Sequence, residues 1–342
     1  MAGQRLAEHP PVFVVGCGRS GTTMLRLMLD SHPDLAIPGE GHFIPFAYRG
    51  RHKHISGGLL DAEGLARKIM RGLHFRRWEV PSELVLDRVR ALENPNFASV
   101  VEALYMSYAE LHGKVRWGDK TPVYVRVIPL LAELFPAAVF IHVIRDGRDV
   151  ALSYLSVPWG PASIWQAARK WKKDVSAGRG AAADLGAARY VELRYENLVA
   201  DPSAELRRLC SFAGLAFDER MLGYHSDAVD RLQAGPGAAD YHRSAFAPPT
   251  AGLRHWRTQM APADEESFEA VAGDLLSELG YERRRSVVTR AKRAEVAARG
   301  NLLAVRTVGS KLKKKLLRES VRRRQPIMEI TSPTTTEGRH ID

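Results

Sequence analysis

The sequence predicts an α/β protein with a three-layer, P-loop-like fold, in which helices flank a central parallel sheet. Short apolar runs that suit buried strands, at residues 12–15 and 137–144, alternate with longer segments of helical periodicity. This alternation is typical of strand–helix–strand units, whose strands run parallel. With 342 residues, of which 45% are hydrophobic, the chain can bury a core of the size that this fold requires.

The elements follow in a regular order, with glycine, proline and aspartate between them. Strands are assigned to β-branched and apolar runs, and helices to apolar residues three or four positions apart. Pro202 suits the first turn of a helix, and Gly280 suits the position after a helix end. The predicted elements are a strand at 12–15, a helix at 22–30, an extended piece at 35–38, a mostly helical region at 50–115, a turn at 117–122 before a helix to about 135, a strand at 137–144, helices from about 148 and at 162–178, a strand at 190–193, a helix from 202, a loop at 226–253 and a helix at 264–279.

The stretch VFVVGCGRSGTT, residues 12–23, reads as a strand, a glycine-rich loop and the start of a helix. The backbone N–H groups of such a loop and the positive end of the helix dipole converge on one point and bind a phosphate-like anion. Gly16 and Gly21 match the nucleotide-triphosphatase spacing, but Thr22 stands where that pattern has its lysine. A cation lies within the loop instead, at Arg19. We therefore expect the loop to hold a terminal phosphate-like group in another way than an ATPase or GTPase does.

A second candidate anion site follows the strand at 137–144. Arg145 lies at its carboxyl end, where open α/β sheets bind ligands, and Ser153 lies about two helical turns further along. Arginine can hold a phosphate through two parallel hydrogen bonds, and serine adds a hydroxyl. A structural ion pair of Arg145 with Asp146 or Asp149 is the alternative. Together with the first loop, the pair indicates a ligand with two separated anionic groups.

The net charge of +11 is concentrated near the end of the sequence. Residues 281–342 carry 17 Lys and Arg against 6 Asp and Glu, whereas residues 1–280 carry 33 of each sign. This distribution argues against a nucleic-acid surface on the body of the protein. We expect a domain at 1–281 and a basic extension at 282–342, partly helical or disordered. The extension is either solvated or in peripheral contact with an anionic membrane.

Cysteine usage and hydropathy favour a cytoplasmic protein. The two cysteines, Cys17 and Cys210, do not suggest a disulfide framework and suit a reducing compartment. Cys17 lies in the anion loop, where a thiol pKa can be low, but no obvious base follows it. A small loop residue is therefore its favoured role, ahead of a nucleophile. Residues 1–11 lack the apolar core of a signal peptide, and no apolar run is long enough to cross a membrane.

Three segments, in the same order, resemble the PAPS-dependent sulfotransferases, whose donor is 3′-phosphoadenosine-5′-phosphosulfate. GCGRSGTTMLRLMLDSHPD, from residue 16, resembles their 5′-phosphosulfate loop, and VFIHVIRDGRDVALSYL, from residue 139, resembles their 3′-phosphate motif. RYENLVADPSAELRRLCSFAGL, from residue 194, resembles a further segment whose tyrosine contacts the adenine. The resemblance implies these donor-binding residues: Gly18, Arg19, Ser20, Gly21, Thr22, Thr23, Arg145, Ser153 and Tyr195.

The first segment and its continuation are similar to the protein-tyrosine sulfotransferases. The chain has PGEG at 38–41 where that branch has a double glutamate, and the similarity implies Glu40 as the catalytic base. His42 is the rival base, or a loop histidine without a role. A carboxylate can serve as the base if burial raises its pKa.

Two further segments resemble parts of the donor site. WGDKTP, from residue 117, is common in bacterial members, and by similarity Lys120 approaches the transferring sulfuryl group, as Arg19 does from the loop. LRHWR, from residue 253, resembles the last cofactor segment, which makes Arg254 and Arg257 candidates for the 3′-phosphate. Ordinary surface arginines are the alternative.

The resemblance implies an enzyme that moves a sulfuryl group from PAPS to an acceptor hydroxyl in one in-line step, with no metal. Carbohydrate, glycolipid, tyrosine and small alcohols or phenols stay open as acceptors, and so does the oligomeric state. One alternative is a P-loop kinase of a small molecule, which Thr22 in place of lysine disfavours. The other is a non-catalytic protein of this fold that binds PAP or a membrane. The presence of Arg19, Glu40 and Lys120 disfavours that interpretation.

Overall fold

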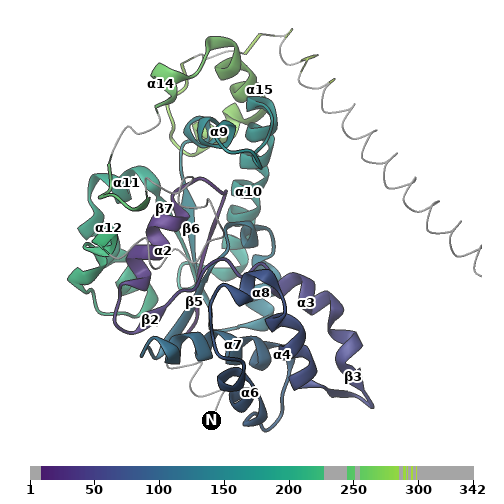
Figure 1. The fold of residues 1–342 in the computed structure, drawn as a ribbon. Helices are drawn as coiled ribbons and strands as arrows, with labels where there is room; N and C mark the ends of the chain where they lie inside the picture. The colour runs from purple at the N-terminus through teal and green to yellow at the C-terminus, as the bar shows by residue number, and fades with distance from the viewer. Residues whose placement is uncertain are drawn as a thin grey trace, which may run out of the picture. The chain divides into compact units, whose positions relative to one another are not determined.

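A parallel sheet of five strands forms the centre of the fold, with the strand order β2-β5-β1-β6-β7 (Figure 1). The computed structural model describes residues 9–226, 245–250 and 255–284, with six isolated positions between 288 and 298. The strands of the sheet are β1 Val12–Gly16, β2 Leu35–Ala36, β5 Arg116–Lys120, β6 Val139–Ile144 and β7 Tyr190–Arg194. The predicted parallel α/β architecture is confirmed.

Helices surround this sheet, and a short hairpin interrupts the helical region after the second strand. The helices are α2 Thr22–Asp30, α3 Ile44–Gly50, α4 Ala62–Met70, α5 Leu73–Arg76, α6 Ser82–Arg90, α7 Phe97–Leu111, α8 Ile128–Leu134, α9 Gly147–Leu155, α10 Ile164–Leu185, α11 Tyr195–Ala200, α12 Pro202–Ala213, α14 Trp256–Gln259 and α15 Pro262–Glu278. The hairpin pairs β3 Ile55–Ser56 with β4 Leu59–Leu60 in antiparallel register.

The side chains of β1 show why the molecule has three layers. All five β1 residues are buried, and successive side chains of a strand point to opposite faces of the sheet. Phe13 and Val15 pack with residues of α4, α6, α7 and α8, whereas Val12 and Val14 pack with residues of α2, α11 and α12. One apolar strand therefore supplies core to both helical layers.

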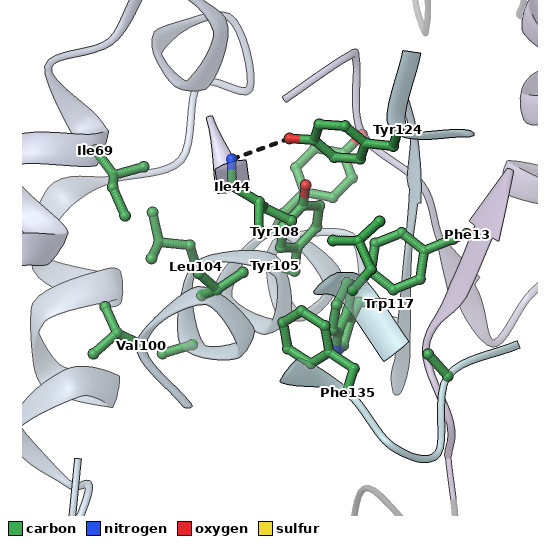
Figure 2. Packing of buried hydrophobic residues seen from close by; sticks show 14 of the residues in the cluster. Phe13, Ile44, Ile69, Val100, Leu104, Tyr105, Tyr108, Trp117, Tyr124 and Phe135 are labelled. Atoms are coloured by element: carbon green, nitrogen blue, oxygen red, sulfur yellow. Dashed lines mark hydrogen bonds between the residues drawn. The ribbon is translucent and has the colours of Figure 1, made fainter. Parts of the chain in front are cut away.

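Aromatic side chains dominate the layer against α7 (Figure 2). The Phe13 ring stacks on Phe140 with centroids 5.3 Å apart and meets Trp117 edge-on at 5.6 Å. Trp117 in turn stacks on Tyr105 at 4.5 Å. Contacts of this kind add to the hydrophobic stabilisation of the core and fix ring orientation. They also hold α7 firmly against β5.

The prediction of a turn at 117–122 was wrong. Residues 116–120, RWGDK, form β5, which lies between β1 and β2 and is buried along its whole length. Glycine, aspartate and lysine are disfavoured in strands, so the local sequence conceals this one. The helix predicted to follow is divided into a 3₁₀ helix, η2 Pro122–Arg126, and α8.

The other helices and strands predicted within the described residues are present, with shifted boundaries. The helix predicted at 162–178 continues to Leu185 as α10, although it contains Gly178 and Gly180. The predicted loop at 226–253 lies mostly outside the described residues, as do Arg254 and nearly all of the basic extension. None of the described helices has the length and apolar character needed to cross a bilayer.

Candidate active site

The loop between β1 and α2 forms an open helix N-terminus. Gly21, the N-cap residue of α2, has φ +94° and, as a glycine, no side chain to cap the first N–H groups of the helix. A Cβ atom on Gly21 would lie 2.3 Å from Cδ2 of Tyr195, and one on Gly16 would lie 2.6 Å from the carbonyl oxygen of Val143. Only glycine permits these approaches. The backbone donors of α2 are thus available to an anion.

Arg19 connects this loop to the second predicted anion site. Its backbone is left-handed, with φ +71°, and its Nε donates to Oγ of Ser153 on α9 over 3.0 Å. Ser20 Oγ is buried and has no hydrogen-bond partner within the described part of the chain. Two motifs that are 134 residues apart in sequence therefore meet at one place.

Arg145, at the end of β6, is almost buried and faces Tyr195. Its guanidinium carbon lies 4.3 Å from the centroid of the Tyr195 ring, in a cation–π contact. The ion pair predicted as the alternative is present but long, with 3.6 Å between Nη2 of Arg145 and Oδ2 of Asp149. Asp146 pairs with Arg148 instead, at 2.8 Å from Oδ2 to Nη2. Nε of Arg145 is buried without a partner in the described residues. The arginine thus keeps hydrogen-bonding capacity for a ligand.

Glu40 and Lys120 form the centre of the site. Nζ of Lys120, whose side chain is 5% exposed, donates to Oε1 of Glu40 over 2.7 Å and to Oγ1 of Thr23 over 3.3 Å. The other carboxylate oxygen, Oε2, lies 2.7 Å from Nε2 of His42. Burial alone would raise the pKa of Glu40, but the charge of Lys120 and the hydrogen bond of His42 outweigh it and hold the pKa well below its ordinary value. Glu40 is therefore ionised in this arrangement.

His42, the rival base, sits in a strained position. Its backbone φ is +55°, and its ring lies 4.6 Å from the ring of His74 on α5. Burial and the neighbouring His42 lower the pKa of His74. The two histidines and Glu40 thus form one group beside Lys120. The geometry brings both predicted bases together.

Cys17 has the environment of an inert thiol. It is buried, its Sγ lies 3.8 Å from the hydroxyl of Tyr154, and burial raises its pKa to about 12. A thiol with so high a pKa is protonated near neutral pH, which disfavours a role as nucleophile. Its role as a small loop residue agrees with the packing.

Of the two arginines predicted in the 253–257 segment, Arg254 lies outside the described residues. Arg257 is exposed, pairs with Glu282 and lies over the Trp256 ring. In the described part of the protein, no three His, Cys, Asp or Glu side chains are placed so that they could together hold a metal ion.

Sequence reasoning missed Asp119 and Thr121, which lie at the end of β5. Asp119 is fully buried, and burial raises its pKa to about 6. Its Oδ2 accepts hydrogen bonds from Tyr105 over 2.7 Å and from Thr121 over 3.1 Å. The signal that could have identified Asp119 and Thr121 is the polar segment GDKT, residues 118–121. It is informative only once residues 116–120 are known to form a central strand, where polar residues are unusual.

A family model described as the sulfotransferase family matches residues 10–219. The chain belongs to the sulfotransferase family. Among its relatives, a protein-tyrosine sulfotransferase of Drosophila melanogaster is 24% identical over 289 residues, which are 80% of this chain and 52% of that protein. The nodulation protein NoeE of Sinorhizobium fredii (strain NBRC 101917 / NGR234) is 28% identical over 305 residues, which cover 79% of this chain and 65% of NoeE. This sulfotransferase thus spans about half of the Drosophila relative.

Solved structures show the same fold. The sulfotransferase domain of the Synechococcus PCC 7002 olefin synthase superposes with a TM-score of 0.58 at 27% identity and covers 80% of this sulfotransferase and 94% of that chain. The sulfotransferase domain from the curacin biosynthetic pathway superposes with a TM-score of 0.55 at 24% identity, and the match covers 80% of this chain and 99% of that domain. Membership of this family favours the sulfotransferase interpretation over the kinase interpretation.

Proposed function

We propose that this enzyme transfers the sulfuryl group of PAPS to an acceptor hydroxyl and releases PAP and a sulfate ester. The observation that carries the proposal is the junction of the two anion sites, where Arg19 of the loop binds Ser153 of α9. Two cationic sites joined in this way suit a donor with a phosphosulfate at one end and a second phosphate at the other.

The donor-binding roles follow from this junction. The N-terminus of α2 and loop residues Gly18 to Thr23 would hold the 5′-phosphosulfate, because uncapped N–H groups favour anions. Arg145 and Ser153 would hold the 3′-phosphate. Tyr195 would contact the adenine, and its place beside Gly21 and Arg145 supports that role.

The chemical step is an in-line displacement at sulfur. The acceptor oxygen forms a bond to sulfur while the bond from sulfur to the 5′-phosphate oxygen breaks. The hydroxyl proton passes to the base, and the electron pair stays on the leaving phosphate oxygen. Lys120 and Arg19 would stabilise the negative charge that develops on this oxygen in the transition state, a role that a metal ion has in other group-transfer enzymes.

Glu40 is the proposed base, and its contact with Lys120 suggests how its basicity changes. In the present arrangement Lys120 donates to Glu40 and Thr23. The anionic oxygens of the donor would compete for the ammonium group of Lys120. Its hydrogen bond to Glu40 would then weaken, and the pKa of the Glu40 carboxylate would rise. His42, hydrogen-bonded to Glu40, is the second candidate for the proton and remains so in the proposal.

Calorimetric titration with PAP and with adenosine 5′-phosphate tests the donor assignment. We expect PAP to bind at least tenfold more tightly, because charge-assisted hydrogen bonds to the 3′-phosphate contribute about 1.5–3 kcal/mol. Equal affinities would remove the 3′-phosphate site. Incubation of the enzyme with sulfur-labelled PAPS and fractionated cell extract would then identify the acceptor among carbohydrates, glycolipids, tyrosine-containing peptides and small alcohols.

We further propose a catalytic body at 1–281, a basic extension at 282–342 and a cytoplasmic location. The 17 Lys and Arg in residues 281–342 support the basic extension. The two cysteines of the chain support the cytoplasmic location, because so few do not suggest a disulfide framework. Deletion of residues 283–342 tests the membrane role of the extension. We expect reduced sedimentation with anionic vesicles, and undiminished binding would refute it.

A further inference from the structure

The loop that carries Glu40, residues 37–43, is held by buried side chains rather than by a regular backbone ladder. At its start, Ile37 N donates to Oδ1 of Asp30 over 2.8 Å, and Ile37 O accepts from Nε of Arg26 over 2.8 Å. Just beyond its end, Ile44 N donates to the hydroxyl of Tyr124 over 3.1 Å. Both ends are therefore fixed to the core.

The residues on either side of Glu40 have their own anchors. Gly39 O accepts a hydrogen bond from Nε1 of Trp78 over 2.9 Å, and Gly41 N donates to Oγ1 of Thr121 over 3.2 Å. Both anchoring side chains are buried. One anchor is a donor and the other an acceptor, so the two peptide groups beside Glu40 are fixed in position and direction.

Asp119 determines which way the Thr121 anchor points. The hydroxyl of Thr121 has one proton, which it donates to Oδ2 of Asp119 over 3.1 Å. Its lone pairs are then directed away from Asp119, where they accept from Gly41 N. Tyr105 donates to the same Asp119 oxygen over 2.7 Å and steadies the carboxylate. A chain of hydrogen bonds thus runs from α7 through β5 to the Glu40 loop.

The same strand supplies the partner of Glu40. Asp119 and Lys120 are consecutive in β5, so their side chains point to opposite faces of the sheet. Lys120 reaches Thr23 on α2, whereas Asp119 reaches Tyr105 on α7. Since Lys120 ends β5 and Thr121, which anchors the Glu40 loop, directly follows it, the separation of the Glu40 carboxylate and the Lys120 ammonium is set by adjacent residues of one segment.

We propose that Thr121, oriented by Asp119, is a positioning residue that fixes Glu40 against Lys120 for proton transfer. This inference rests on the proposed function, in which Glu40 accepts the proton of the acceptor. A displacement of about 1 Å at a reacting group can reduce a rate about 100-fold, so a group of this kind needs a fixed support.

The test compares Thr121→Val with Thr121→Ser in the full chain. Valine keeps the shape of threonine but removes the hydroxyl, whereas serine restores it. Ser107→Ala is the matched control, because Ser107 is also fully buried and its hydroxyl donates to the Ala103 carbonyl within α7, away from the Glu40 loop in sequence. Three quantities are measured for each variant: deuterium exchange of the peptide spanning residues 37–43, PAP affinity by calorimetry, and sulfuryl transfer from labelled PAPS to water, which requires no knowledge of the natural acceptor.

We expect Thr121→Val to accelerate exchange in the 37–43 peptide and to lower the transfer rate at least tenfold, with PAP affinity within about twofold of the wild type. Thr121→Ser should recover most of the rate, and Ser107→Ala should change neither exchange nor rate. Unchanged exchange in Thr121→Val, or a normal rate despite faster exchange, would overturn the positioning role alone. A wild type that neither binds PAP nor transfers the label would instead refute the proposed function, and the positioning role with it.

Discussion

Replacing Glu40 by glutamine tests the centre of the site most directly. The substitution keeps the shape of the side chain but removes the charge that Lys120 contacts at 2.7 Å. A buried ion pair that loses one partner costs about 3–5 kcal/mol, and an exposed pair less than about 1 kcal/mol. Lys120 is buried but one third of the Glu40 side chain is exposed, so we expect an intermediate loss of about 2 kcal/mol in the free energy of unfolding.

This loss corresponds to a decrease in Tm of about 3–4 °C for a domain of about 280 residues, since the entropy of unfolding is about 2.1 cal/mol/K per residue. Sulfuryl transfer should fall about 100- to 10,000-fold, because a general base contributes a factor in that range. PAP affinity should stay within about threefold of the wild type, since Glu40 is not assigned to the donor. Thermal melting, initial rates with labelled PAPS and calorimetry measure the three quantities.

Glu63→Gln is the matched control, because Glu63 is a partly exposed glutamate of α4 that pairs with Arg67 and Arg90. It should leave transfer unchanged. A Glu40→Gln enzyme that keeps more than a tenth of its activity would refute the assignment of Glu40 as base and leave His42 as the candidate. Parallel losses of affinity and rate would indicate structural damage instead.

Three further changes probe the donor site and its support. Arg145→Ala should weaken PAP binding about 10- to 100-fold in calorimetry, since a charge-assisted hydrogen bond is lost, and an unchanged affinity would exclude the 3′-phosphate role. Gly21→Ala should cost about 2–4 kcal/mol in urea unfolding, because its Cβ would lie 2.3 Å from Tyr195 at φ +94°, whereas Gly180→Ala in open space should be neutral or stabilising. Burial raises the pKa of Asp119 from 3.8 to about 6, so the folded protein binds a proton at this carboxyl more tightly than the unfolded chain does. The contribution of Asp119 protonation to the free energy of unfolding is therefore complete below about pH 4 and is lost as the pH rises to about 6. Asp119→Asn should flatten stability over this interval, and an unchanged pH profile would contradict the assignment.

The anion loop was predictable because its signals are local. A strand, two spaced glycines and a helix start within twelve residues specify the geometry between Val12 and Thr23 without knowledge of the rest of the fold. The contact of Arg19 with Ser153 is different, since 134 residues separate them and only the pairing of β1 with β6 brings their loops together.

The strand β5 and the burial of Asp119 could not be predicted in the same way. The segment RWGDK has the composition of a turn, and its extended form depends on hydrogen bonds to β1 and β2 on either side. Similarly, α10 passes the expected end near Gly178 because that glycine packs against the buried ring of His142. In both cases tertiary contacts override the local preference.

The alternation of Asp119 and Lys120 along β5 restricts how this protein can change during evolution. Insertion of one residue before position 119 would move each following side chain of the strand to the opposite face and put the Asp119 carboxylate where the ammonium meets Glu40. Two acids would then face each other at the donor site, and a lysine would enter the aromatic layer of α7. Length changes should therefore accumulate in the loops around β5, while the spacing from Arg116 to Thr121 stays constant among active relatives.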